Sequence, residues 1–206
     1  MAATSASNSF RQVIGLLKAR DPGAAAFLPQ LERFADYGPG WLALGGVLEE
    51  MHHRAAAVIA YRRAAEARGA SAELGQRAGQ ALARLGDGAA AIAAFQRAIT
   101  NDAGFAPAWY SLGLALQDQH ACAAAAEAFA AARRLRPDFH EAAFNQAIAL
   151  QEVGRIEAAL DAYAEAYRLR PESFGRIAQA LISAPAGALW LKPSALRAFL
   201  KDRATA

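Results

Sequence analysis

Residues 106–139 read APAWYSLGLALQDQHACAAAAEAFAAARRLRPDF. In the first half of this stretch, Trp109 and Leu116 stand seven residues apart, and in the second half Ala125 and Phe129 stand four apart. Apolar residues at these spacings share one face of a helix. The stretch therefore predicts two amphipathic helices joined by a short turn.

The same pattern returns every 34 residues, in blocks 38–71, 72–105, 106–139 and 140–173. In each block the eighth, twentieth and twenty-seventh places are small, the eleventh is Leu and the twenty-fourth is aromatic. The clearest columns are Gly45, Gly79, Gly113 and Ala147; Leu48, Leu82, Leu116 and Leu150; and Tyr61, Phe95, Phe129 and Tyr163. Four aromatic residues in phase with the other columns indicate a true internal repeat rather than an Ala-rich composition.

At these positions the chain resembles the tetratricopeptide repeat family, whose unit is a 34-residue helix–turn–helix. Block 106–139 carries the resemblance best, and it ends at Pro137 as block 140–173 ends at Pro171. The other blocks depart from the pattern in places: Gly75 and Ala143 stand where Trp109 does. The resemblance implies an all-α fold, a right-handed α-solenoid of antiparallel helix pairs with four repeat units.

Residues outside the four blocks are expected to cap the solenoid. Residues 1–37 read as a degenerate helix pair, with one apolar stripe at Phe10, Val13, Ile14 and Leu17 and another at Leu28, Leu31 and Phe34. Residues 174–206 read as a helix bearing Ile177, Leu181 and Ile182 on one side, an apolar loop, and a last helix behind Ser194 as N-cap. In the loop, Trp190 either covers the last repeat or forms a second partner contact.

Composition narrows the class of protein. The chain has 206 residues, 55% of them hydrophobic, and a net charge of +3. Such an apolar chain can fold, and the nearly balanced charge argues against nucleic-acid binding. Cys122 is the single cysteine, which favours a reducing cytoplasm. The Arg- and Ala-rich composition suggests a bacterial source, and we expect neither a secretory signal nor a membrane span.

No constellation of residues predicts catalysis, a cofactor or a metal site. His52 and His53 are adjacent, so on a helix they point about 100° apart and cannot act as an i, i+4 metal pair. Cys122 stands amid alanines with no His marked as its partner, and we expect it to be a packing residue. The chain is therefore predicted not to be an enzyme.

In the family, the first helix of each unit lines a concave groove for a partner. The resemblance places Leu42, Glu49, Gln76, Gln80, Arg84, Tyr110, Leu114, Gln117, Phe144, Ile148 and Gln151 in that groove. Chaperone-binding members hold a terminal carboxylate with Lys and Asn at the fifth and ninth places, where the first block here has Leu42 and Gly46. Binding of chaperone tails is therefore not expected. The groove would instead bind an apolar or amphipathic peptide, with Tyr110 and Phe144 either as anchors or as packing residues.

The function predicted is a non-catalytic scaffold or adaptor that binds a protein or peptide. Two alternatives remain: an accessory subunit that presents a substrate to a modifying enzyme, and a chaperone for secreted apolar segments. The sequence does not decide between monomer and dimer.

Overall fold

A computed structural model describes residues 2–21, 23–183 and 193–204. Over these residues the secondary structure is entirely helical, which confirms the all-α prediction. None of the described helices is both long and apolar enough to cross a membrane. The chain divides into two compact units, residues 1–103 and 104–206, which we describe in turn.

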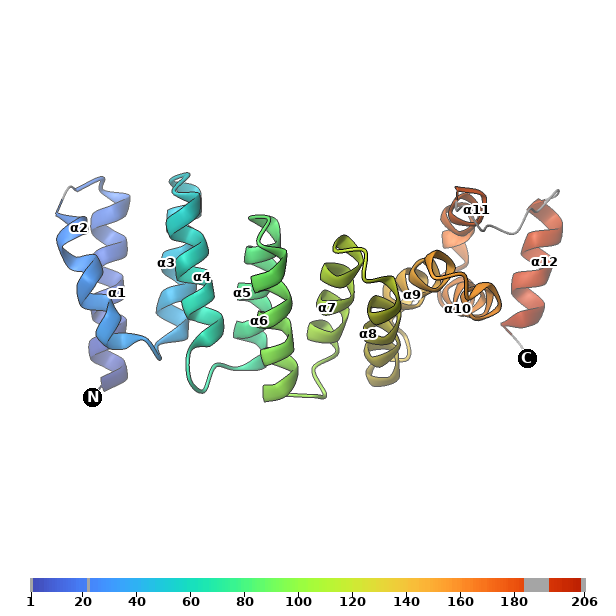
Figure 1. Cartoon of the computed structure of the whole chain (residues 1–206), viewed down its shortest axis with the longest axis horizontal. Coiled ribbons are helices and arrows are strands. Elements are labelled where there is room, and N and C mark those ends of the chain that lie inside the picture. Colours follow the sequence, from blue (N-terminus) through green and yellow to red (C-terminus); the bar gives the residue numbers. More distant parts are fainter. Residues whose placement is uncertain (1, 22, 184–192, 205–206) are drawn as a thin grey trace. The chain divides into compact units, whose positions relative to one another are not determined.

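The first unit begins with a long helix and continues as two helix pairs (Figure 1). Its elements are α1 (Ala2–Lys18), α2 (Ala24–Phe27), the 3-10 helix η1 (Leu28–Phe34), α3 (Gly38–Glu50), α4 (Arg54–Glu66), α5 (Ala72–Arg84) and α6 (Gly88–Asn101). Helix α3 packs along α4 and α5 along α6, α4 also contacts α5, and α1 lies against α3. The helices therefore form successive layers, as predicted.

The second unit has two more helix pairs and two further helices. Its elements are α7 (Ala106–Asp118), α8 (Cys122–Leu135), α9 (His140–Glu152), α10 (Ile156–Leu169), the 3-10 helix η2 (Pro171–Ser173), α11 (Phe174–Ser183) and α12 (Pro193–Arg203). Helix α7 packs on α8, α8 on α9 and α9 on α10. Helix α12 packs on α10 and α11.

Helix starts keep the 34-residue period seen in the sequence. The first helices of the four pairs begin at Gly38, Ala72, Ala106 and His140, and the second helices begin at Arg54, Gly88, Cys122 and Ile156. Equivalent residues therefore occupy equivalent places in each pair.

In the first three pairs an aromatic ring packs against a glycine, as at Gly45, where an added Cβ would lie 2.7 Å from Tyr61. A Cβ atom added to Gly79 would lie 2.6 Å from Phe95, and one added to Gly113 would lie 2.5 Å from Phe129. Both rings are buried. The glycine column thus exists because the ring of the second helix rests directly on the backbone of the first.

The turn inside each pair has a left-handed residue at the fifteenth place. These residues are His52, Gly86, His120 and Gly154, with φ of 62°, 77°, 58° and 78°. In the second pair, the Gly86 amide donates to the Ala83 carbonyl and the Asp87 amide to the Leu82 carbonyl, and the other three turns repeat these bonds. This is the Schellman ending of a helix, which favours glycine.

The two ends differ from the predictions in detail. The stripe of Leu28, Leu31 and Phe34 lies in a 3-10 helix, whose three residues per turn match that spacing. At the other end Ile182 is 68% exposed, so it was wrongly grouped with the buried Ile177 and Leu181.

The last helix also begins earlier than expected. It starts at Pro193, which places Ser194 inside the first turn rather than at the N-cap. Leu196 and Leu200 of this helix are buried in the core of the second unit. Trp190 lies outside the described residues.

Candidate functional site

The first unit contains a hollow between its two first helices, which we call the α3–α5 groove. Its volume is about 600 Å³. The lining residues are Pro39, Leu42, Ala43, Gly46, Tyr61, Ser71, Glu73, Leu74, Arg77, Gln80, Ala81 and Arg84. In Figure 1, α3 and α5 are the more distant helices of this unit, behind α4 and α6.

The two walls of the α3–α5 groove differ in chemistry. Helix α3 contributes an apolar, shallow wall made of Pro39, Leu42, Ala43 and Gly46. Helix α5 contributes a polar wall, because Glu73, Arg77, Gln80 and Arg84 follow one another at spacings of four, three and four residues. Residues at these spacings share one helix face. The groove can therefore contact apolar side chains on one side and hydrogen-bonding groups on the other.

A hydrogen-bonded trio fixes one end of the polar wall. The Tyr61 hydroxyl donates to Glu49 Oε2 at 2.7 Å, and Arg84 Nη2 donates to the same oxygen at 3.0 Å. The hydrogen bonds from Arg84 and Tyr61 lower the pKa of Glu49, while burial and the nearby carboxylate raise the pKa of Tyr61. Glu49 and Arg84 thus satisfy each other, and neither carries an unpaired charge.

Three of the residues predicted for the groove do line it: Leu42, Gln80 and Arg84. Glu49 is connected to it through Arg84, whereas Gln76 is half-buried on α5 and lies outside the lining set. The prediction omitted Arg77, which stands next to the place that the family resemblance indicates. The sequence feature that could have revealed Arg77 is its spacing from Glu73 and Gln80. These three polar residues share one face of α5 and are separated in the sequence mainly by small and apolar residues.

In the second unit, Tyr110 is half-buried, and its side chain packs against other residues of the protein. Its ring centroid lies 4.7 Å from that of Phe139 and 5.6 Å from that of Phe129. Its hydroxyl accepts a hydrogen bond from Asn145 Nδ2 at 2.9 Å, and burial raises its pKa. The ring therefore already packs against two other aromatic side chains of the protein.

The remaining predicted residues of α7 and α9 divide into accessible and buried ones. Leu114 is exposed, and Gln117 and Ile148 are half-buried. Phe144 and Gln151 are only 5% and 3% exposed. Of the two roles left open for Phe144, its burial therefore favours packing, and Gln151 is buried instead of lining a groove as predicted.

The burial of Phe144 and of Gln151 has a physical reason. The ring of Phe144 packs on Tyr163, and the guanidinium of Arg176 in α11 lies 4.4 Å from its centroid. Gln151 Oε1 accepts a hydrogen bond from the Tyr163 hydroxyl at 2.8 Å. The repeat pattern marks these places on the first helix but does not reveal that α10 and α11 cover them.

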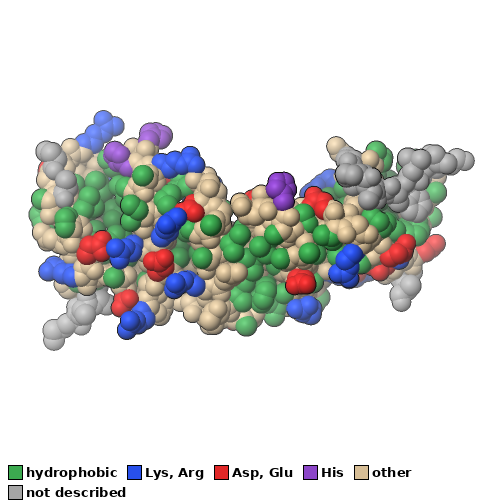
Figure 2. All heavy atoms as spheres, in the orientation of Figure 1, with side chains coloured by type: hydrophobic (Ala, Val, Ile, Leu, Met, Phe, Trp, Pro, Cys, Tyr) green, Lys and Arg blue, Asp and Glu red, His purple; other side chains and the backbone are tan. Residues whose placement is uncertain are grey.

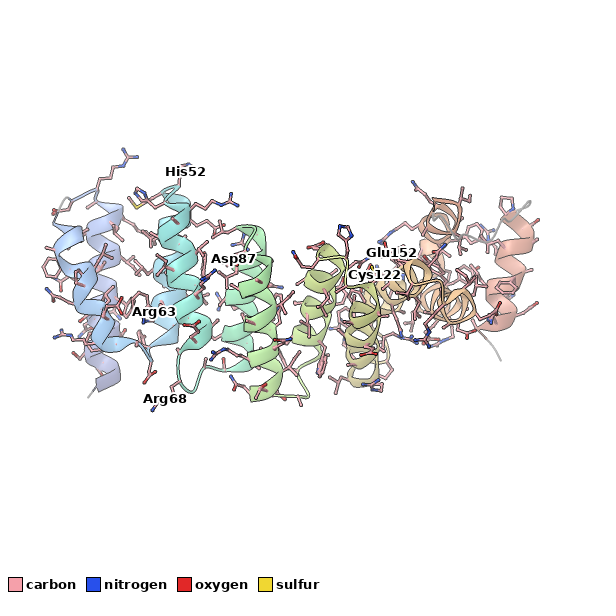
Figure 3. The ribbon with its side chains drawn as sticks, viewed as in Figure 1. His52, Arg63, Arg68, Asp87, Cys122 and Glu152 are labelled. Carbon is pink, nitrogen blue, oxygen red and sulfur yellow. The ribbon has the colours of Figure 1, made fainter. Side chains whose placement is uncertain are left out.

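The thiol of Cys122 is hydrogen-bonded to a carboxylate. Cys122 Sγ lies 2.8 Å from Glu152 Oε2, and the two side chains lie together in Figure 3. The hydrogen bond to Glu152 raises the pKa of the thiol, so the reactive thiolate is disfavoured. Over the described residues, no group of three or more His, Cys, Asp or Glu side chains is placed to hold a metal ion.

Charges on the opposite face of the first unit alternate in sign. Figure 2 shows basic and acidic side chains interspersed there. Arg62 Nε donates to Asp87 Oδ2 at 3.0 Å, and Arg63 lies 2.9 Å from Glu32. These pairs tie neighbouring elements together and leave no broad basic patch on the face shown.

Comparison with known proteins agrees with this architecture. A family model for the tetratricopeptide repeat matches residues 73–105. Residues 73–105 are thus a tetratricopeptide repeat, and the chain has the fold of tetratricopeptide-repeat proteins. No curated protein matches the chain in sequence.

The similar solved structures belong to the same class. A crystal structure of MamA protein matches with a TM-score of 0.60 and 21% identity, over 81% of this chain and 94% of that one. The crystal structure of YrrB, described as a TPR protein with an unusual peptide-binding site, matches with a TM-score of 0.59 and 21% identity, over 81% and 86% of the two chains. A second MamA structure has 23% identity and a TM-score of 0.58, over 77% and 94%. At these identities the likeness concerns the fold.

Proposed function

We propose that this chain is a non-catalytic, cytoplasmic adaptor that binds a peptide segment of a partner protein in the α3–α5 groove. The observation that carries the proposal is the groove itself, about 600 Å³ in volume with one apolar and one polar wall. The peptide-binding site named for YrrB, which has the same fold, supports it. In this proposal, blocks 38–71, 72–105, 106–139 and 140–173 are the repeat units, and the segments 1–37 and 174–206 are caps.

Two properties favour a protein partner over other classes. The interspersed charges of the first unit suit protein contacts better than the one-sided basic face that nucleic acid requires. The thiol held by Glu152 favours an interaction module over a nucleophilic enzyme. Leu114 and Ile148 offer a second apolar surface on α7 and α9 for the same or another partner.

The proposal is tested by selecting random displayed peptides on the full chain. Leu42→Arg places a charge on the apolar wall and should abolish capture of the selected peptides. Ile59→Arg is the matched control, because Ile59 is 59% exposed on α4 and does not line the groove. Circular dichroism should show the same helicity in both variants.

Two results would contradict the proposal. One is peptide capture that survives Leu42→Arg, and the other is equal loss in both variants. An enzyme recovered with the chain in stoichiometric amounts would favour the accessory-subunit alternative, and rescue of an insoluble apolar client would favour the chaperone.

A further inference from the structure

The polar wall of the α3–α5 groove carries two charges of opposite sign that the protein leaves unpaired. Glu73 and Arg77 both line the groove, one helical turn apart, and no hydrogen bond or ion pair of either side chain is found among the described residues. Arg84, the other basic residue of this wall, is bonded to Glu49. A ligand entering the groove would therefore find one free acidic and one free basic group.

Binding of a ligand to these two charges would cost the protein little stability. Glu73 and Arg77 are both exposed, and a pair at this spacing on a helix surface adds little to stability even when it forms. Because no such pair is found between these two described side chains, ligand charges can contact both of them without breaking an ion pair of α5. Gln80, one turn further on, adds an amide that can both donate and accept hydrogen bonds.

The spacing of the two charges matches an extended peptide. Four residues of an α-helix rise about 6 Å along its axis. In an extended chain, residues i and i+2 lie on the same side and are separated by roughly 6.6 Å. Two such side chains can meet Glu73 and Arg77 together, while the residue between them faces the apolar wall at Leu42.

The length of the polar wall suits a short extended peptide. Glu73 and Arg84 are 11 residues apart, so the wall is about 16 Å long. About five extended residues span the same length.

We infer that the α3–α5 groove binds an extended peptide in which a basic and an acidic side chain stand two residues apart, with apolar side chains alternating between them. The basic side chain pairs with Glu73, the acidic one pairs with Arg77, and the apolar ones contact Pro39 and Leu42. This inference rests on the proposed peptide-binding function and adds the charge order of the ligand to it.

Three synthetic peptides test the charge order. Their cores are Leu-Lys-Leu-Asp-Leu, Leu-Asp-Leu-Lys-Leu and Leu-Gln-Leu-Gln-Leu, each flanked by Gly and Ser, blocked at both ends and labelled with fluorescein. Affinity for the full chain is measured by fluorescence anisotropy. For a peptide bound in a single chain direction, one order gives two attractions and the other two repulsions, so we expect the protein to prefer one charged order by about fivefold. The preference should vanish in 1 M salt.

Two variants make the test specific. Glu73→Arg with Arg77→Glu exchanges the charges and should reverse the preference between the two charged peptides. Glu73→Gln with Arg77→Gln removes both charges, and this variant should bind the three peptides with equal affinity. It replaces the charge-exchanged variant in the test if that variant folds poorly.

The outcomes separate this inference from the function on which it rests. One outcome is that the protein binds all three peptides with equal affinity and that Leu42→Arg abolishes this binding. It would overturn the inferred charge order but support the proposed peptide-binding function. A preference that does not reverse would also overturn it, and so would binding only of a helical peptide. If none of the three binds while peptides from the random selection do, the inference fails and the proposed function stands.

Discussion

At the scale of single residues, the most informative contact is the one between a glycine and an aromatic ring. The sequence predicts both columns. It does not reveal that the residues at the eighth and twenty-fourth places touch each other. A repeat period gives positions along the chain, and it does not give distances between the two helices of a pair. The structure adds that contact at Gly45, Gly79 and Gly113.

Gly113→Ala should therefore destabilise the protein although alanine is the better helix former. The new Cβ would lie 2.5 Å from Phe129, and overpacking of a buried site costs about 1–3 kcal/mol, against a gain of about 1 kcal/mol in helix propensity. Urea unfolding should show a net loss of about 1 kcal/mol.

Gly15→Ala is the control for that substitution. Apart from the backbone of α1 itself, no described atom lies within 4 Å of the position of its Cβ, in the middle of α1. It should stabilise the protein by about 0.5–1 kcal/mol through helix propensity alone. Equal effects of the two substitutions would refute the packing explanation.

His120→Gly should stabilise the protein. His120 has φ of 58°, and a side chain in this left-handed region is strained where glycine is not. We expect a gain of about 0.5–1 kcal/mol, measured as a higher unfolding midpoint. His53→Gly is the matched control, since φ at His53 is −82°, and a midpoint raised in both variants would argue against backbone strain.

At the scale of elements, helix α9 begins with a buried histidine. His140 is 3% exposed, and among the described residues neither ring nitrogen has a hydrogen-bond partner. Glu141 lies beside it, Arg170 and Arg176 are the basic groups near it, and its ring stacks on Phe144. Burial, assisted by Arg170, lowers the pKa of His140, so the folded state holds the imidazole neutral.

This burial makes stability depend on pH. The unfolded chain takes up a proton near the ordinary histidine pKa of about 6.5, and the folded chain does so only at lower pH. Below pH 6.5 the unfolded state therefore binds more protons, and the free energy of unfolding should fall as the pH falls, until the folded pKa is reached. His140→Phe should flatten this dependence between pH 7 and 5 in urea unfolding, whereas the exposed His53→Gln should not. An unchanged slope in His140→Phe would exclude the buried imidazole as its source.

Helix α8 lacks the cap that α6 has. Asp87 precedes α6 and accepts a hydrogen bond from the Ala90 amide at 3.2 Å, while Ala121 stands at the equivalent place before α8. Ala121→Asp should add about 1 kcal/mol to the free energy of unfolding. Ala123→Asp, inside the first turn, controls for charge near the helix terminus, and an equal gain there would show that charge and not capping is responsible.

The sequence predicted the helices better than the surfaces between them. The period predicted two helices in each block, and the structure has two helices in each of the four blocks. Phe144 and Gln151 could not be placed, because their burial depends on Tyr163 and Arg176, which come from other helices. Ile182 was misplaced because the apolar stripe of α11 is narrower than its composition suggests.

At the scale of the whole molecule, α12 covers the apolar face of the second unit. Leu196 and Leu200 are 2% and 0% exposed and join Ile177 and Leu181 in one core. Leu200→Ala should cost about 2–5 kcal/mol, with amide exchange accelerated in α10 and α11 first. Ser194→Ala, on the exposed side of the same helix, should change little. Unaltered exchange in Leu200→Ala would mean that α12 does not stabilise this unit.

The overall period could be predicted from the sequence, but the candidate groove only in part. The family resemblance selected Leu42, Gln80 and Arg84 by position. It could not show that Arg84 is neutralised by Glu49 while Arg77 has no ion-pair partner among the described residues, because that difference depends on side-chain contacts between two helices.

The contact between ring and glycine has one more consequence. Tyr61 follows Gly45 by 16 positions, as Phe95 follows Gly79, Phe129 follows Gly113 and Tyr163 follows Ala147. Each partnership is therefore encoded within a single stretch of DNA shorter than one period. Duplicating or deleting 102 nucleotides, which encode 34 residues, at equivalent points would leave every such partnership intact. A gene built in this way can change the length of its protein in whole steps, without any compensating mutation elsewhere.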